Sequence, residues 1–358
     1  MSVFFTGFPG FIATQLMARL AADHTELAAL IIPADRQKAE QQAAAIEEMT
    51  GCPKIRLIEG DITKQDLGLS EVDLRFMHTK KWTVWHLAAV YDLAVPKDLA
   101  WSVNVVGTEN MNQFVRSLPE LERYMYFSTA YVAGVREGRL YEHELVRPMA
   151  FKNFYEETKF EAEVLVDALK AQLPVTIIRP GIVRGSAESG ETVKFDGPYF
   201  FLNMIDRLSF LPFIPFIGRS HADINVVPID YILEASLYLS TLPEASSKTV
   251  HLTDPNPYPV EEVYRAMVYE MTGKYPAGRF PRAFAAAGMK VAPIRKYLRV
   301  EAETLDYMTW ESSFDTAVAT ALLQDSGIRC ADFLETMPAM VEFYKAHKHE
   351  ENFQIHIH

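Results

Sequence analysis

The sequence predicts an α/β protein with a doubly wound parallel sheet that is covered by helices on both faces. Its first half alternates short apolar or β-branched runs with longer stretches that have apolar residues at helical spacing. A glycine-containing turn directly follows the first short run and leads into the first helical stretch. With 358 residues, of which 49% are hydrophobic, the chain is long enough to bury a substantial core.

Six of the short runs have strand length and are bounded by Gly, Pro, Asp or polar clusters. We expect them to form parallel strands joined by right-handed crossovers. The expected strands are 3–6, 27–32, 55–59, 83–88, 124–128 and 175–179, and expected helices include 13–22, 37–49 and 160–169.

After Gly185 the sequence becomes rich in Pro and aromatic residues, which indicates a smaller C-terminal substrate domain. We expect residues 1–185 to form the main domain and 222–250 to return to it, and the substrate domain to comprise 186–221 and 251–358. The strongly apolar segment 197–218 contains Asp206, Arg207 and three prolines, so it is expected to be core or the wall of a substrate channel rather than a membrane contact.

Charge and cysteine content exclude several classes of protein. The formal net charge of −12, without a dense Lys/Arg run, disfavours nucleic-acid binding. Only Cys52 and Cys330 are present, so neither a disulfide framework nor a metal site is expected. The N-terminus lacks the pattern of a secretory signal and no transmembrane segment is expected, which predicts a cytoplasmic protein.

The turn after the first strand has the features of a dinucleotide-binding loop. Gly7 can adopt a backbone conformation that a side chain would oppose, and Gly10 lets the backbone approach a pyrophosphate. The helix that follows offers free N–H groups and the positive end of its dipole. We therefore expect a Rossmann-type domain whose cofactor loop consists of Gly7, Phe8, Pro9, Gly10, Phe11 and Ile12.

Other residues at the ends of strands are candidates for cofactor contacts. The second strand ends at Ile32 and lacks the acidic residue that would bind the adenosine ribose of NAD. Arg36 could instead bind a 2′-phosphate, which favours NADP(H) over NAD(H), although a solvated loop arginine is the alternative. Asp61 and Ile62 are placed for the adenine ring, and the small residues Ala88 and Ala89 allow the backbone to pass close to the cofactor.

The pair Tyr155 and Lys159 has the spacing of a catalytic acid–base pair. Residues four apart lie on one helix face, so the lysine ammonium is expected near the phenol oxygen. An unperturbed tyrosine has a pKa of about 10, and an adjacent cation would stabilise its phenolate. The alternative is an exposed helix pair without function.

The segment 127–134 (FSTAYVAG) completes a pattern that resembles the extended short-chain dehydrogenases/reductases. The resemblance covers most of residues 1–255 and implies a catalytic hydroxyl at Thr129, with Ser128 as the alternative. It also implies that Asn104 is the family's helix asparagine and that a homodimer forms through the helices around Asn104 and Tyr155. The segment beside the nicotinamide would be Pro180, Gly181, Ile182 and Val183.

A narrower resemblance is to the fatty acyl-CoA reductase and thioester reductase branch of that superfamily. It depends on four segments: 88–93 (AAVYDL), 128–131 (STAY), 153–163 (NFYEETKFEAE) and 227–231 (VPIDY).

Together these features predict an NAD(P)-dependent oxidoreductase that transfers hydride between nicotinamide and a carbonyl, thioester or alcohol carbon. A hydrophobic substrate is expected from Tyr199, Phe200, Phe201, Phe210 and Phe213 in the second domain. Two alternatives are a nucleotide-sugar epimerase or dehydratase of the same superfamily and a non-catalytic NAD(P)-binding sensor.

Overall fold

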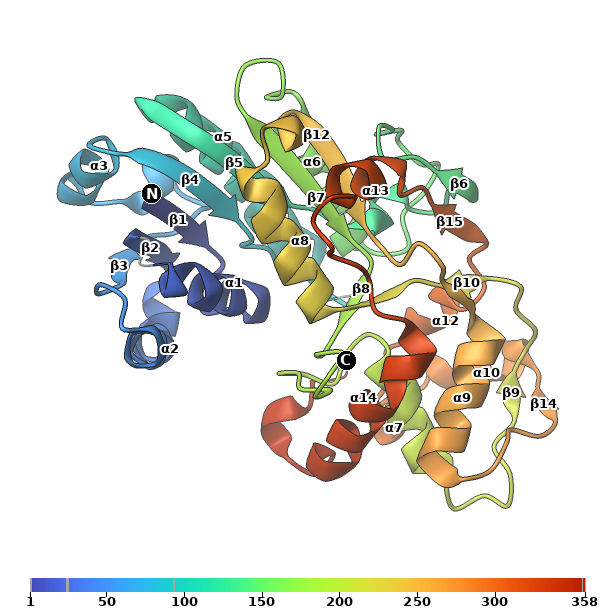
Figure 1. Cartoon of the computed structure of the whole chain (residues 1–358). Coiled ribbons are helices and arrows are strands. Elements are labelled where there is room, and N and C mark those ends of the chain that lie inside the picture. Colours follow the sequence, from blue (N-terminus) through green and yellow to red (C-terminus); the bar gives the residue numbers. More distant parts are fainter. Residues whose placement is uncertain (1, 24–25, 93, 356, 358) are drawn as a thin grey trace.

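The computed structural model of the chain describes residues 2–23, 26–92, 94–355 and 357. Seven parallel strands form one sheet in the order β12-β7-β5-β4-β1-β2-β3 (Figure 1). The strands are β1 (Ser2–Thr6), β2 (Glu26–Ile31), β3 (Arg56–Glu59), β4 (Lys81–His86), β5 (Glu120–Phe127), β7 (Val175–Pro180) and β12 (Lys248–Leu252). The predicted doubly wound sheet is therefore confirmed, and the strand order reverses direction between β1 and β4, where such folds bind ligands.

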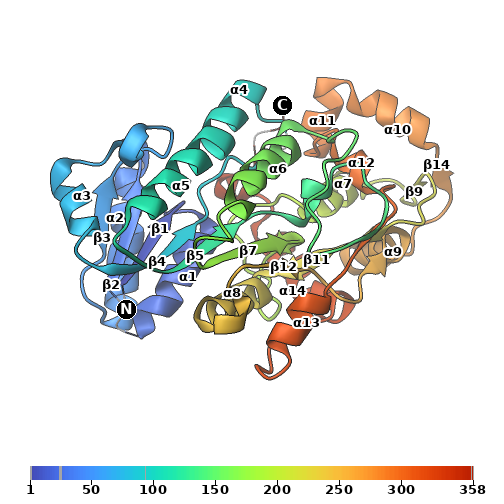
Figure 2. The same cartoon turned by 90° about the horizontal axis from the view of Figure 1, so that it is seen from above.

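Helices cover both faces of this sheet (Figure 2). One face packs against α1 (Phe11–Ala22), α2 (Arg36–Thr50), α8 (Ile229–Thr241) and α13 (Ala317–Leu323). The other face packs against α3 (Glu71–Met77), α5 (Gly107–Ser117) and α6 (Phe154–Asp167). Burial on both faces explains why the strands have nearly continuous apolar sequences.

The predicted elements of the sheet domain are present with shifts of a few residues at their ends. The largest shift concerns α6, which begins at Phe154 rather than at 160. The Asn153 side chain accepts a hydrogen bond from the Glu156 N–H at 2.9 Å and so caps the helix before Tyr155. This cap places Tyr155 in the first turn of α6.

A second hydrophobic cluster lies beside the sheet domain and contains α7 (Tyr199–Leu208), α9 (Val260–Thr272) and α14 (Phe333–His347). Tyr199, Phe200 and Phe201 are buried in it, whereas Phe210 and Phe213 are exposed, so the part 210–213 of the segment 197–218 is not core. The remaining elements are short: α4 (Lys97–Ala100), α10 (Arg282–Met289), α11 (Ala292–Leu298), α12 (Thr304–Tyr307), β6 (Gly138–Leu140), β8 (Ile182–Arg184), β9 (Phe216–Ile217), β10 (Asp223–Ile224), β11 (Val226–Pro228), β13 (Tyr258–Pro259), β14 (Arg279–Phe280) and β15 (Ser312–Phe314).

Among the described residues, none of the helices combines the length and apolar character that a bilayer-spanning helix needs. The same residues contain no group of three or more His, Cys, Asp or Glu side chains that could hold a metal ion.

Candidate active site

The turn between β1 and α1 has the backbone geometry that a pyrophosphate requires. Gly7 has φ +90°, and a Cβ atom there would lie 2.8 Å from the backbone nitrogen of Ala88. The Gly10 N–H donates to the Gly7 carbonyl at 2.7 Å, and Gly10 is exposed at the start of α1. Phe8 and Pro9 are buried, while Phe11 and Ile12 are half-buried. The exposed Gly10 backbone and the adjacent helix N-terminus fit a dinucleotide phosphate.

A buried set of hydrogen bonds holds the end of β4 against this turn. His86 Nδ1 and Thr6 Oγ1 are 2.7 Å apart, His86 Nε2 and Thr108 Oγ1 are 3.1 Å apart, and the Ala88 N–H donates to Thr6 Oγ1 at 3.2 Å. Burial, with a smaller contribution from Lys159, lowers the pKa of His86 to about 3, so the ring is neutral. His86 thus fixes Ala88 and Ala89 beside the glycine turn. No sequence feature indicated this role beyond the position of His86 at a strand end.

The residues expected at the adenine end lie at the same edge of the sheet. Asp61 accepts hydrogen bonds from the Thr63 N–H at 2.8 Å and from the Thr63 hydroxyl at 2.7 Å. The buried Ile62 side chain packs where a Cβ of Gly107 would stand. Asp61 and Ile62 are therefore held in a fixed loop after β3.

Arg36 is exposed at the first position of α2 and is already engaged by two carboxylates. Its guanidinium is 2.7 Å from Glu59 and 3.2 Å from Glu40, and these contacts raise its pKa. A 2′-phosphate would have to compete with Glu59 for this guanidinium.

Tyr155 and Thr129 are brought together, although 26 positions of sequence separate them. Burial raises the pKa of Tyr155 to about 12, and a side-chain hydrogen bond with Thr129 opposes this rise. The Thr129 hydroxyl also accepts a hydrogen bond from the Tyr131 N–H at 3.3 Å. A high pKa keeps the phenol protonated at neutral pH, as a proton donor requires.

Lys159 makes different contacts from those that the sequence suggested. Its ammonium donates to the Phe127 carbonyl at 2.6 Å and to the Tyr126 hydroxyl at 3.0 Å, and no hydrogen bond from it to Tyr155 is present in the described residues. Burial lowers the pKa of Lys159 to about 7, against a raising effect of Glu163. The lysine reaches the end of β5 instead, because α6 packs directly on that strand and the Phe127 carbonyl is the nearest buried acceptor.

The neighbouring hydroxyl, Ser128, belongs to a buried charged network and not to the Tyr155 pair. Ser128 Oγ donates to Glu163, whose other carboxylate oxygen accepts from Arg179 Nε at 2.8 Å and Nη2 at 2.5 Å. Arg179 also lies 3.2 Å from His251 Nε2. Glu163 and Arg179 are almost completely buried, so the network fixes α6 against the ends of β5 and β7. Ser128 therefore takes part in this charged network, whereas Thr129 lies beside Tyr155.

Asn104 lies in a π-helical turn, Trp101–Val106, and its side chain contacts other protein groups. Its side-chain amide accepts from the Val90 N–H at 2.8 Å and donates to the Val90 carbonyl and to Thr158 Oγ1, both at 3.0 Å. The structure therefore places Asn104 between the loop after β4 and helix α6. The buried amide is engaged by protein groups, and a catalytic role for Asn104 stays a prediction. Leu93, at the end of the 88–93 motif, lies outside the described residues.

The expected nicotinamide segment begins at the end of β7 and runs into β8. A Cβ on Gly181 would meet the Asn225 side chain at 2.6 Å, and the Ile182 N–H donates to the Asn225 carbonyl at 2.9 Å. Pro180 is buried, whereas Ile182 and Val183 are half-buried. These contacts attach the segment to the start of β11.

A second buried ion pair lies one residue beyond Tyr155 and was not anticipated from the sequence. The Glu156 carboxylate lies 3.6 Å from Lys152 Nζ and accepts a hydrogen bond from the Tyr307 hydroxyl at 2.7 Å. Lys152 Nζ stands 3.6 Å from the centre of the Trp310 ring. Residues of the C-terminal region thus contact the catalytic helix directly.

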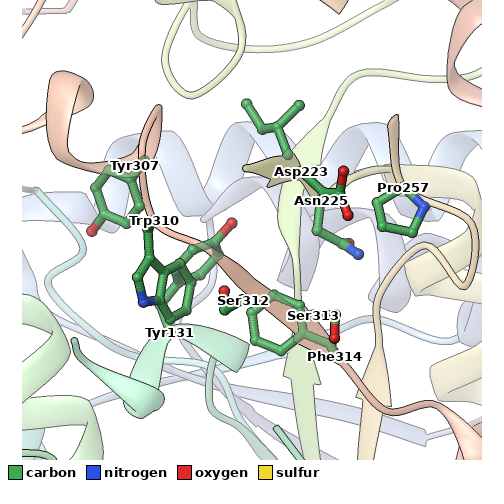
Figure 3. A pocket seen from close by; sticks show the side chains of 10 residues that line it. Tyr131, Asp223, Asn225, Pro257, Tyr307, Trp310, Ser312, Ser313 and Phe314 are labelled. Carbon is green, nitrogen blue, oxygen red and sulfur yellow. The ribbon is translucent and has the colours of Figure 1, made fainter. Parts of the chain in front are cut away.

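An aromatic pocket extends from these residues (Figure 3). Tyr131, Tyr307 and Trp310 gather on one side of it, and Asp223, Asn225 and Pro257 lie on the other. Ile224, Ser312, Ser313 and Phe314 complete the lining, which contains no Lys or Arg. Because Tyr131 follows Thr129 by two positions, the pocket starts close to the candidate catalytic hydroxyl.

Comparison with known proteins identifies relatives of this chain. The family described as male sterility protein, an NAD-binding family, matches residues 5–236. Fatty acyl-CoA reductase wat of Drosophila melanogaster is 26% identical over 274 residues, which cover 66% of this chain and 53% of that protein. Nonribosomal peptide synthetase asaC of Aspergillus flavus is 25% identical over 276 residues, covering 71% of this chain and 26% of that protein. The first curated relatives are matched over between 24% and 60% of their own length.

Among solved structures, the terminal R domain of the myxalamid PKS-NRPS biosynthetic pathway has a TM-score of 0.81 at 22% identity, with 98% of this chain and 92% of that chain covered. A UDP-galactose 4-epimerase has a TM-score of 0.62 at 15% identity and covers 98% of this chain and all of its own. Both structures share the fold. The family match covers more than half of the chain, so this protein belongs to the male sterility protein family, in the thioester reductase-like branch of the extended short-chain dehydrogenases/reductases.

Proposed function

We propose that this protein is an NAD(P)-dependent reductase of a hydrophobic thioester or carbonyl compound. The observation that carries the proposal is the proximity of Tyr155 and Thr129 at the carboxyl edge of the sheet, where Thr129 opposes the rise in the pKa of Tyr155. The His86 contacts hold the loop after β4 against the glycine turn, and Asn104 connects this loop to α6. These contacts connect the glycine turn to the helix that carries Tyr155. They support a site in which the reacting carbon of the substrate lies between Tyr155 and the nicotinamide.

The protein's own groups would act on the substrate oxygen. Thr129 would donate a hydrogen bond to the carbonyl oxygen, and Tyr155 would deliver its proton as negative charge develops there. The bound nicotinamide supplies the hydride. Lys159, held by the Phe127 carbonyl, would contribute positive charge beneath the phenol and bind the nicotinamide ribose.

The fatty acyl-CoA reductase relatives and the aromatic lining of the pocket support an apolar acyl group as substrate. The pocket lining of four aromatic side chains without Lys or Arg suits an acyl chain better than a nucleotide diphosphate. We therefore propose that the acyl group lies against Tyr131 and Trp310 and that the carbonyl group to be reduced lies at Thr129.

Within the same proposal the cofactor is NADP(H) and the protein is a homodimer. Arg36 is the cation nearest the end of β2, and its Glu59 contact is exposed enough to exchange for a phosphate. The dimer would bury apolar side chains on α4, the π-helical turn and α6. These are Leu99, Trp101, Phe154 and Val164, which are all exposed in the single chain. Sedimentation of the wild type against Trp101→Glu would test the dimer, because a charge there should shift the equilibrium to monomer.

The deciding experiment measures NADPH and NADH binding, followed by loss of reduced-nicotinamide absorbance across acyl-CoAs, aldehydes and ketones of increasing chain length. We expect net NADPH oxidation with long-chain thioesters or aldehydes. Tight cofactor binding without net oxidation of any compound, combined with turnover of a nucleotide sugar, would contradict the proposal.

A further inference from the structure

One segment at an end of the molecule carries basic side chains and lacks acidic ones. Helix α10 and strands β9 and β14 lie at the end opposite β3 and α3 (Figure 2). Residues 271–300 contain seven Lys or Arg and no Asp or Glu, although the whole chain has a net charge of −12. We call residues 210–213 and 274–299 the basic tip.

The basic tip also exposes large apolar side chains. Phe210 is 72% exposed, Phe284 67%, and Phe213 and Tyr297 53% each. The rings of Phe280 and Phe284 are 6.3 Å apart, and the Cβ position of Gly278 lies 3.8 Å from the Phe213 ring. Phe213, Phe280 and Phe284 are thus neighbours, and grouped exposed apolar side chains mark a contact surface in monomeric proteins.

Several cations on the basic tip are available to an external partner. Arg279 is paired with Glu261 at 2.7 Å, and Arg282 is 3.5 Å from Asp306. In contrast, Lys274, Lys290 and Lys296 are exposed and form no ion pair with any described residue. Their charge is therefore not neutralised within the part of the chain that the structure describes.

We propose that the basic tip binds peripherally to an anionic lipid membrane. Phenylalanine rings on three separate segments, the loop 210–213, β14 and α10, would enter the boundary between headgroups and acyl chains. The lysine ammonium groups would meet lipid phosphates. Exposed rings on separate segments, in a part of the chain that carries only basic charged side chains, fit a deformable lipid surface better than a groove-lined protein contact. The acidic remainder of the chain would be repelled by the same membrane, which orients the protein tip-first.

Sedimentation with vesicles tests this inference without any turnover. The purified protein is mixed with vesicles of phosphatidylcholine alone or of phosphatidylcholine with phosphatidylglycerol, at low and high salt. We expect at least a tenfold greater bound fraction on the anionic vesicles, reduced by salt. F280S/F284S and K290E/K296E should each reduce binding to the level seen with phosphatidylcholine alone.

Two control variants carry the same changes elsewhere on the surface. V72S/M149S removes exposed apolar side chains and K54E/K248E reverses two exposed charges, and both should bind as the wild type does. Equal binding of the tip variants and the wild type would overturn the proposal. Absence of wild-type binding to anionic vesicles would also overturn it and would leave the tip as a candidate site for an acidic protein. Because no substrate is used, either result is independent of the proposed reductase function.

Discussion

The Lys159 ammonium donates to the Phe127 carbonyl at 2.6 Å, across the contact between α6 and β5. Phe127 directly precedes Ser128 and Thr129, so the lysine is attached to the strand that presents the candidate catalytic hydroxyl. In this structure Lys159 therefore positions β5 relative to α6, through its hydrogen bonds to Tyr126 and Phe127.

Replacement of Tyr155 by Phe should remove the proton donor while leaving the cofactor turn intact. We expect turnover to fall by about 10²–10⁴-fold with little change in NADPH affinity. Steady-state kinetics and a fluorescence titration of NADPH measure the two effects. Turnover close to that of the wild type would refute the assignment of Tyr155.

The two adjacent hydroxyls should give opposite results. Thr129→Val removes the hydroxyl beside Tyr155 and should lower kcat by about 10²–10³-fold, as for loss of an oxyanion donor. Ser128→Ala removes only a donor to Glu163 and should mainly lower thermal stability. Comparison of kcat and Tm for the two variants separates the roles, and a larger loss of kcat in Ser128→Ala would reverse the assignment.

Removal of Glu163 should strongly destabilise the protein, because the buried Arg179 would lose its counter-charge. We expect Glu163→Ala to cost about 3–5 kcal/mol in the free energy of unfolding. The double variant Glu163→Met/Arg179→Met removes both charges and should cost less than the two single variants together. Strictly additive losses in denaturant unfolding would show that the ion pair does not couple α6 to β7.

The lowered pKa of Lys159 predicts a pH-dependent stability. The unfolded lysine holds its proton up to about 10.5, and the folded lysine only up to about 7. Between these values the unfolded chain binds more protons, so stability should rise with pH by up to about 1.4 kcal/mol per unit. The Lys159→Met variant lacks this contribution. Denaturant unfolding at pH 7 to 9 measures the free energy of unfolding of both proteins. The value for the wild type minus that for Lys159→Met should increase with pH. A difference that does not change with pH would contradict a buried lysine that loses its proton near pH 7.

Cofactor preference should respond to the contacts of Arg36. Arg36→Ala should weaken NADPH binding by about tenfold, the effect of losing one phosphate ion pair of about 1.4 kcal/mol, and should leave NADH binding unchanged. Glu59→Gln releases the guanidinium and should strengthen NADPH binding. If neither variant changes the ratio of the two affinities, Arg36 does not read the 2′-phosphate.

The sequence by itself determined the sheet and the chemistry that its edge can support. Apolar runs of strand length, separated by helical periodicity, specified a parallel sheet because strands buried on both faces must be apolar throughout. Gly7 and Gly10 could be recognised because their requirement for an absent side chain is local, and Tyr155 and Lys159 because helix spacing places residues four apart on one face.

Only the tertiary structure decided which groups meet. The proximity of Thr129 to Tyr155, the hydrogen bond of Ser128 to Glu163 and the hydrogen bonds of Asn104 to Val90 and Thr158 join segments distant in sequence. The same holds for Tyr307, which reaches Glu156 from 151 positions away. Burial also set the protonation of His86 and Lys159, since desolvation depends on what packs around a group, and no local pattern encodes that.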